Sequence, residues 1–239
     1  MFDKIKIEKI LFLDIETAPQ YANYNLLPER IKNFWDKKAK TIAKNDESAE
    51  ELYKKAGIYS EFGKIITISF AYIRKNKENN NYLIVKSIYG DNEKEILHLF
   101  NKLLDTHFNS NINYLCAHNG KEFDFPYIAR RSLVNGIKVA NILYTPGAKP
   151  WEVNHLDTLE LWKFGDYKKW ISLDLLTTIF DIPSPKNEID GSDVHRVYWE
   201  EKNINKIQEY CQRDVIALTQ VFLKIAQKDI IPNELIFLK

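Results

Sequence analysis

The chain has 239 residues, of which 45% are hydrophobic and 28% charged, and its formal net charge is +1 at pH 7. The length fits one large domain or one domain with an insertion, and a charge near zero neither indicates nor excludes binding to nucleic acid. No apolar run approaches the roughly 20 residues of a membrane span, and the N-terminus lacks the apolar segment of a signal peptide. The two cysteines, Cys116 and Cys211, are too widely spaced for a zinc motif and fit a reducing compartment. We therefore expect a cytoplasmic protein that does not enter membranes.

The first part of the chain predicts strands interrupted by a helical excursion. A nearly continuous apolar run over residues 9–15 is typical of a strand buried on both faces. Residues 21–62 are charged, with helical spacing around 49–56, and predict a helical insertion between the first two strands. Residues 65–73 and 82–88 are rich in β-branched and aromatic residues and predict two strands joined as a hairpin.

Strands and helices alternate in the remainder. The expected elements are an amphipathic helix from 91, a strand over 114–118, a helix from Asp124 to Gly136, a short strand within 151–157, and helices over 159–164, 172–180 and about 203–228. This order indicates an α/β class, with a mixed five-stranded sheet flanked by helices. We expect a single domain over residues 1–239.

Asp14 and Glu16 form the first candidate site. Residues two apart in a strand point to the same face, so both carboxylates should project together from the end of the first strand. Two adjacent carboxylates repel each other unless a cation lies between them, and oxygen-rich acidic sites suit Mg²⁺ or Mn²⁺. Taken alone, a pair of surface residues at a strand end explains this motif equally well.

Two later segments carry further candidates. Asn119 to Asp124 follows a buried strand and precedes a helix, where an aspartate most often caps the helix N-terminus. Tyr210 and Asp214 lie four residues apart in the last long helix and therefore share one of its faces. Each segment taken separately has an ordinary structural explanation.

Together and in this order, the three segments resemble the three motifs of the 3′→5′ exonucleases that are named for four acidic residues. The motifs are D-I-E-T, N-x-x-x-F-D and Y-x-x-x-D, and the resemblance spans positions 9 to about 222. It is closest to the proofreading exonuclease domain of family B DNA polymerases and to stand-alone bacterial proteins similar to that domain. Lys186, ahead of Asp190-Gly191, matches a lysine common in those domains, and Tyr210 rather than a histidine marks the tyrosine subclass. The resemblance implies a ribonuclease H-like fold.

The resemblance also implies an activity and its residues. It implies an exonuclease that removes nucleotides from the 3′ end of DNA, with single strands favoured, and that uses two Mg²⁺ or Mn²⁺ ions. The implied metal ligands are Asp14, Glu16, Asp124 and Asp214, while Tyr210 orients the attacking water. Implied substrate contacts are Thr17, Asn119, Phe123 and Lys186, although a core position explains Phe123 equally well and a solvated loop explains Lys186.

Two other functions stay open. The same chemistry on RNA, as in enzymes similar to ribonuclease D, shares the tyrosine subclass, whereas the Phe-Asp pair and residues 186–191 favour DNA. A catalytically silent nucleic-acid-binding module is disfavoured because all four carboxylates and the tyrosine are intact. Because the chain ends soon after Asp214, we expect no polymerase domain.

Basic runs offer a further feature with two explanations. Lys37-Lys38-Ala39-Lys40, Arg130-Arg131 and Lys168-Lys169 together would form a rim that follows phosphates, although a solvated face explains each run separately. For the insertion over 21–62, the sequence leaves three roles open: covering the site, guiding a strand or docking a partner.

Overall fold

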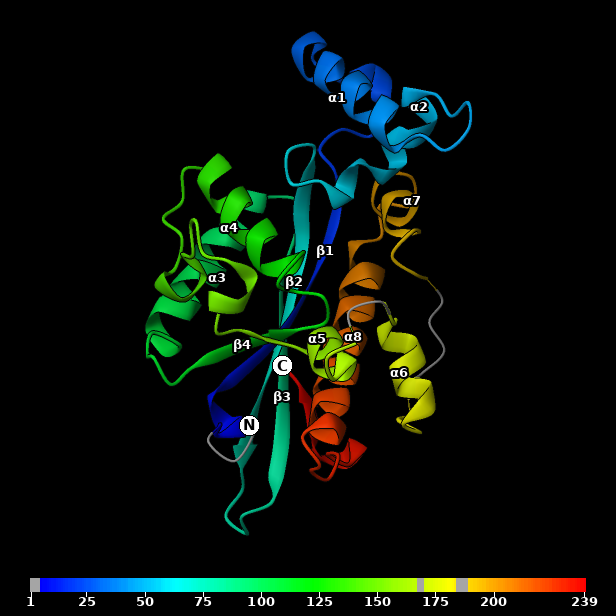
Figure 1. The fold of residues 1–239 in the computed structure, drawn as a ribbon. Coiled ribbons are helices and arrows are strands. Elements are labelled where there is room, and N and C mark those ends of the chain that lie inside the picture. The colour runs from blue at the N-terminus through cyan, green and yellow to red at the C-terminus, as the bar shows by residue number, and fades with distance from the viewer. Residues whose placement is uncertain (1–4, 167–169, 184–188) are drawn as a thin grey trace.

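A central mixed sheet organises the molecule, and helices cover both of its faces (Figure 1). The computed structural model describes residues 5–166, 170–183 and 189–239. Its strands are β1 (Ile10–Pro19), β2 (Gly63–Lys75), β3 (Asn81–Tyr89), β4 (Tyr114–Ala117), β5 (Leu156–Asp157) and β6 (Ile236–Leu238). They are ordered β5-β4-β1-β2-β3-β6, with β2 antiparallel to both neighbours and β4, β5 and β6 parallel to theirs. The α/β class and the mixed sheet are confirmed, with one strand more than expected, because the three residues of β6 are too few to show an alternating pattern.

The helices form two layers on either side of the sheet. They are α1 (Glu29–Ile42), α2 (Ala49–Leu52), α3 (Glu93–His107), α4 (Asp124–Val134), α5 (Thr158–Lys163), α6 (Leu173–Ile179), α7 (Val194–Trp199) and α8 (Ile204–Ile225). α3 and α4 cover one face, and the long α8 covers the other (Figure 1). The sequence did not predict α7, which is shorter than two helical turns. Among the described residues, no helix combines the length and the apolar character needed to cross a membrane.

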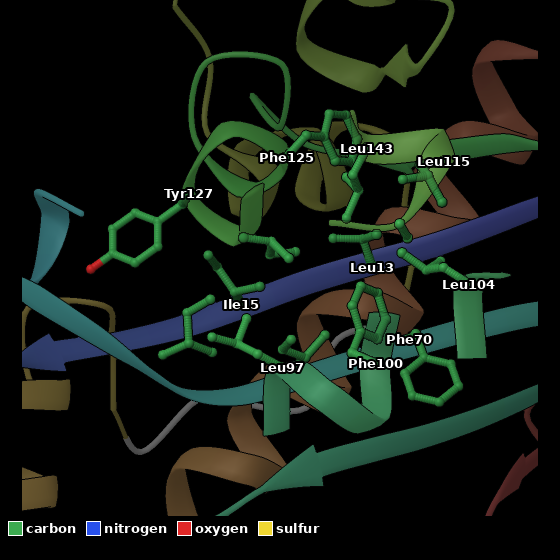
Figure 2. Packing of buried hydrophobic residues seen from close by; sticks show 14 of the residues in the cluster. Leu13, Ile15, Phe70, Leu97, Phe100, Leu104, Leu115, Phe125, Tyr127 and Leu143 are labelled. Atoms are coloured by element: carbon green, nitrogen blue, oxygen red, sulfur yellow. The ribbon is translucent and has the colours of Figure 1, made fainter. Parts of the chain in front are cut away.

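β1 lies between both layers, and its alternating side chains determine where the site forms. Leu13 and Ile15 point into the cluster that α3 and α4 complete (Figure 2). Phe12 belongs to the opposite cluster, where its ring meets Phe222 of α8 edge-on at 5.3 Å. Because the period of a strand is two residues, the even-numbered positions that follow Phe12 face α8.

The insertion over 21–62 is helical, as expected, and builds a small core of its own. Its centre is the fully buried Trp35, whose indole N–H donates to the carbonyl of Ala49 at 2.7 Å. The ring of Trp35 packs edge-on against Tyr53 and Phe62 at 5.5 and 5.2 Å. The insertion is therefore a packed unit rather than an extended loop.

A buried ion pair fastens the end of this insertion to α3 and α4. Arg131 of α4 donates to both carboxylate oxygens of Glu93 at 2.8 and 2.6 Å and to the carbonyl of Ser60 at 3.0 Å. The prediction that Arg131 contributes to an exposed basic rim is therefore wrong, since only 3% of this residue is exposed. The doublet Lys168-Lys169 lies outside the described residues.

Candidate active site

The carboxylates of β1 lie within the strand rather than at its end, because β1 continues beyond them to Pro19. Asp14 and Glu16 both face α8, on the side of the sheet that the alternation of β1 assigns to them. A bulge interrupts the β1–β2 register between Glu16 and Thr17. Bulges often occur beside active sites, where they redirect side chains. Glu16 is buried, whereas Asp14 keeps part of its surface exposed.

Asp124 reaches the same place from the other side of β1. The N-terminus of α4 has Phe123 as its cap residue, and no side chain caps it. The carboxylate of Asp124 instead accepts the backbone N–H of Ile15 at 3.1 Å. The expectation that Asp124 caps its own helix is therefore wrong, because its side chain is committed to a strand 109 residues away in sequence.

The electrostatics of the site are those of crowded carboxylates. Burial, followed by the charges of Glu16, Asp124 and Asp214, raises the pKa of Asp14 well above its ordinary value. Burial and the charges of Asp214 and Asp124 do the same to the pKa of Glu16. Burial raises the pKa of Asp124 to about 7 and the pKa of Asp214 to about 6. Among the described residues, none of these four carboxylates forms an ion pair with lysine or arginine.

This donor set fits a divalent cation. Buried charges are normally paired or bound to metal, because an isolated buried carboxylate is costly. Carboxylate oxygens are the ligands that Mg²⁺ and Mn²⁺ prefer. A cation among Asp14, Glu16, Asp124 and Asp214 would offset the burial of these charges, which is the main cause of their raised pKa values, and the repulsion that further raises the pKa of Asp14 and Glu16.

Tyr210 and Asp214 come from one face of α8, as their spacing predicts. The hydroxyl of Tyr210 is hydrogen-bonded to the carboxylate of Asp214. Burial and the charges of Asp214, Glu16 and Asp14 raise the pKa of Tyr210 above its ordinary value. Tyr210 therefore stays protonated near neutral pH, with its hydroxyl proton donated to Asp214, and its hydroxyl oxygen can still accept a hydrogen bond.

Cys211 is a site residue that sequence reasoning missed. Its thiol donates to a carboxylate oxygen of Asp14 at 3.3 Å and to the Asp14 carbonyl at 3.4 Å. The thiol is also hydrogen-bonded to Ser69, whose hydroxyl lies 2.7 Å from that of Ser87. One ligand atom from each of Asp14, Glu16 and Cys211 lies within 4.8 Å of the others. The only sequence signal was its position three residues before Asp214, on the same helical face.

Asp157 supports the second motif from β5. Its carboxylate accepts the backbone N–H groups of Asn119, Lys121 and Leu159 at 2.9, 3.1 and 3.0 Å. These bonds hold the turn in which Asn119 adopts a positive φ of 60°. Asp157 therefore fixes the segment that leads into Asp124.

The predicted substrate contacts are only partly brought together. Thr17 is hydrogen-bonded to Tyr127, and the ring of Phe123 packs on Tyr127 at 5.3 Å. Thr17, Phe123 and Asn119 are all half-buried beside the carboxylates or the turn before α4. Lys186 lies outside the described residues.

Comparison with known proteins agrees with this geometry. A family described as a predicted 3′–5′ exonuclease related to the exonuclease domain of PolB matches residues 58–230, more than half of the chain. A family B DNA polymerase from the hyperthermophilic archaeon Pyrobaculum calidifontis shares the fold with a TM-score of 0.53 at 14% sequence identity. The match covers 90% of this chain, which spans only 24% of that polymerase. No protein of curated function matches the sequence.

The matched range contains Asp124, Tyr210 and Asp214 and begins after Asp14 and Glu16. The ribonuclease H-like fold and the resemblance to the family B exonuclease domain are confirmed. The chain belongs to the family of predicted 3′–5′ exonucleases related to the exonuclease domain of PolB.

Proposed function

We propose that the protein is a metal-dependent 3′→5′ exonuclease that shortens single-stranded DNA. The observation that carries this proposal is the meeting of Asp14, Glu16, Asp124 and Asp214, from β1, α4 and α8, none of which forms an ion pair among the described residues. Family membership supports the reaction class and the direction of cleavage.

The four carboxylates would hold two Mg²⁺ or Mn²⁺ ions. Such ions, when bound, supply electrostatic stabilisation of the attacking and leaving oxygens of a phosphodiester. The hydroxyl oxygen of Tyr210 would accept a hydrogen bond from the attacking water and so orient it, while the hydroxyl proton is donated to Asp214, which holds the group in place. Since its pKa is raised, Tyr210 positions the water rather than removing its proton.

The terminal nucleotide would lie against the strand and turn that border the carboxylates. Phe123 would stack on the terminal base, an interaction that tolerates any sequence. The hydroxyl or amide of Thr17 and the amide of Asn119 would contact the sugar and phosphate. A contact from Lys186 to a phosphate remains a prediction from the sequence.

DNA is proposed over RNA because the family is related to the exonuclease domain of a DNA polymerase. A cytoplasmic location is part of the proposal and is supported by two cysteines that are buried free thiols. A single domain over residues 1–239 is likewise proposed.

The test compares matched DNA and RNA strands with the wild-type protein and its Asp14→Ala and Asp214→Ala variants, in Mg²⁺ and in Mn²⁺. We expect DNA to be degraded by the wild type and by neither variant, while thermal unfolding shows that all three proteins are folded. Degradation of RNA alone would keep the metal site and change the substrate. An Asp14→Ala variant as active as the wild type would refute the assigned site.

A further inference from the structure

The exposed face of α1 concentrates positive charge on the insertion that follows β1. Its members follow one another at helical spacing and are Arg30, Asn33, Phe34, Lys37, Lys40 and Thr41, all exposed. The helix carries five basic and two acidic residues, a net charge of +3, whereas the whole chain carries +1. Outside α1 the net charge of the chain is therefore −2, so the positive net charge comes from this helix.

The cations of this face have no carboxylate partner within the part of the chain that the structure describes. Among the described residues, Arg30, Lys37 and Lys40 form no ion pair. Of the two acidic residues of α1, Asp36 accepts the hydroxyl of Tyr24 at 2.7 Å, and Glu29, at the N-terminal end of the helix, accepts the amide of Asn33 at 3.4 Å. A merely solvated helix surface typically interleaves both signs of charge, whereas the only carboxylate bonded to this face among the described residues is Glu29, at its N-terminal end.

An exposed aromatic ring lies among these cations. Phe34 is 50% exposed, although the insertion has a core in which its neighbour Trp35 is fully buried. The ammonium group of Lys37 lies 5.7 Å from the centre of the Phe34 ring. An accessible ring flanked by cations is the combination that binds single-stranded nucleic acid without regard to sequence.

The insertion that carries this face is attached to β1 close to the carboxylates. The insertion leaves β1 directly after Pro19, three residues beyond Glu16, which is about 10 Å along a strand. The backbone N–H of Gln20 donates to Phe62 at 3.0 Å, and the indole of Trp199 donates to the Pro19 carbonyl at 3.0 Å. At the far end, the hydroxyl of Tyr127 donates to the Gly57 carbonyl at 2.6 Å.

A close backbone approach completes this attachment. A Cβ added at Gly57 would lie 3.1 Å from the backbone of Thr17 and of Ala18, so the end of the insertion packs directly on β1. In Figure 1, α1 and α2 lie together beyond the end of β1 that follows the carboxylates. The basic face is thus fixed relative to the site.

We propose that this face of α1 binds the phosphate backbone of the same single strand whose 3′ end occupies the carboxylate site, with Phe34 stacked on one of its bases. This inference rests on the proposed function for the identity of the strand. Phosphates would supply the negative charge that Arg30, Lys37 and Lys40 do not receive from an ion pair with any described residue. The insertion therefore guides the substrate.

The test measures binding rather than cleavage. A 5′-labelled oligo-dT of about 20 nucleotides, longer than the roughly 4–16 that single-strand folds cover, is titrated with the Asp14→Ala protein in EDTA at several salt concentrations. Each neutralised phosphate contributes about 0.7 to the slope of log affinity against log salt. A second protein adds three substitutions to Asp14→Ala, namely Arg30→Gln, Lys37→Gln and Lys40→Gln. The magnitude of its slope should be lower by about 2. Raising the salt from 50 to 200 mM lowers the affinity of both proteins. The factor by which it falls should be about 18-fold smaller for the triple variant than for its Asp14→Ala parent.

A matched control removes the same charge elsewhere. The substitutions Lys77→Gln, Lys94→Gln and Lys102→Gln, at exposed positions on the β2–β3 turn and on α3, should leave the slope unchanged. Phe34→Ala should weaken binding at least about fivefold with little change in slope, because stacking is not electrostatic.

An unchanged slope in the α1 variant, an equal fall in the control, or no binding by the Asp14→Ala protein would each overturn the inference. Cleavage by the wild type keeps the two proposals separable. If the wild type degrades DNA while the α1 variant binds normally, only the role of α1 fails. If the wild type cuts nothing in any divalent metal but the slope falls as expected, the role of α1 stands and the nuclease proposal fails.

Discussion

Replacing Asp124 by asparagine should stabilise the metal-free protein at high pH while removing its activity. Burial raises the pKa of Asp124 from 3.8 to about 7. Between those two values the folded state binds a proton that the unfolded state has lost, so the free energy of unfolding falls as pH rises through this window. Each pH unit between the two pKa values is worth about 1.36 kcal/mol, which places the cost of ionising Asp124 near 4 kcal/mol at pH 8.

Asparagine keeps the shape and the acceptor for the Ile15 N–H but carries no charge. Urea unfolding in EDTA measures the free energy of unfolding of both proteins at pH 4 and at pH 8. From pH 4 to pH 8 it should fall by about 4 kcal/mol more for the wild type than for Asp124→Asn. Asp229→Asn, at an exposed position outside the site, should behave like the wild type. Mg²⁺ at pH 8 should raise the free energy of unfolding of the wild type, by about 2.7 kcal/mol when the Mg²⁺ concentration is 100 times Kd. If Asp124→Asn and the wild type lose the same stability between the two pH values, the electrostatic account of the site is wrong.

Three further substitutions separate the roles of neighbouring residues. Tyr210→Phe removes the hydroxyl bonded to Asp214 and should lower kcat about 10–100-fold at unchanged metal dependence; a loss as complete as that of Asp14→Ala would contradict a positioning role. Cys211→Ala removes the thiol donor to Asp14 and should weaken Mn²⁺ binding by calorimetry about 10–100-fold, with Cys211→Ser restoring most of it; equal affinities in all three proteins would rule this out. Arg131→Met leaves the carboxylate of Glu93 buried without its ion-pair partner and should lower the free energy of urea unfolding by about 3–5 kcal/mol. A decrease of less than about 1 kcal/mol would show that the ion pair contributes little to stability.

Local periodicity made the central part of the site predictable. Asp14 and Glu16 share a face because a strand repeats every two residues, and Tyr210 and Asp214 share one because a helix repeats every 3.6. The chain order of the three motifs then indicated which elements would meet. The structure agrees with both periodicities and places the two faces opposite each other.

The remaining features of the site and of the buried ion pair depend on tertiary contacts that no local sequence pattern encodes. Cys211 donates to Asp14 across 197 positions of sequence, and its own surroundings resemble any buried cysteine. For Asp124 the local rule predicted the wrong role, because an aspartate before a helix most commonly caps its N-terminus. The hydrogen bond that its carboxylate accepts from Ile15 is a tertiary contact. Arg131 looked like half of a basic doublet, yet its partner Glu93 lies on another helix.

The central claim is metal-dependent cleavage from the 3′ end, and one labelled strand tests it most directly. A 5′-labelled single-stranded DNA is incubated with the protein in Mg²⁺ or Mn²⁺, and in EDTA, with the Asp14→Ala variant run in parallel. We expect the wild type in Mg²⁺ or Mn²⁺ to produce a ladder of successively shorter 5′-labelled products. The strand should stay intact in EDTA and with the Asp14→Ala variant. Release of the labelled 5′ nucleotide as the first product, or a ladder that persists in EDTA, would contradict it.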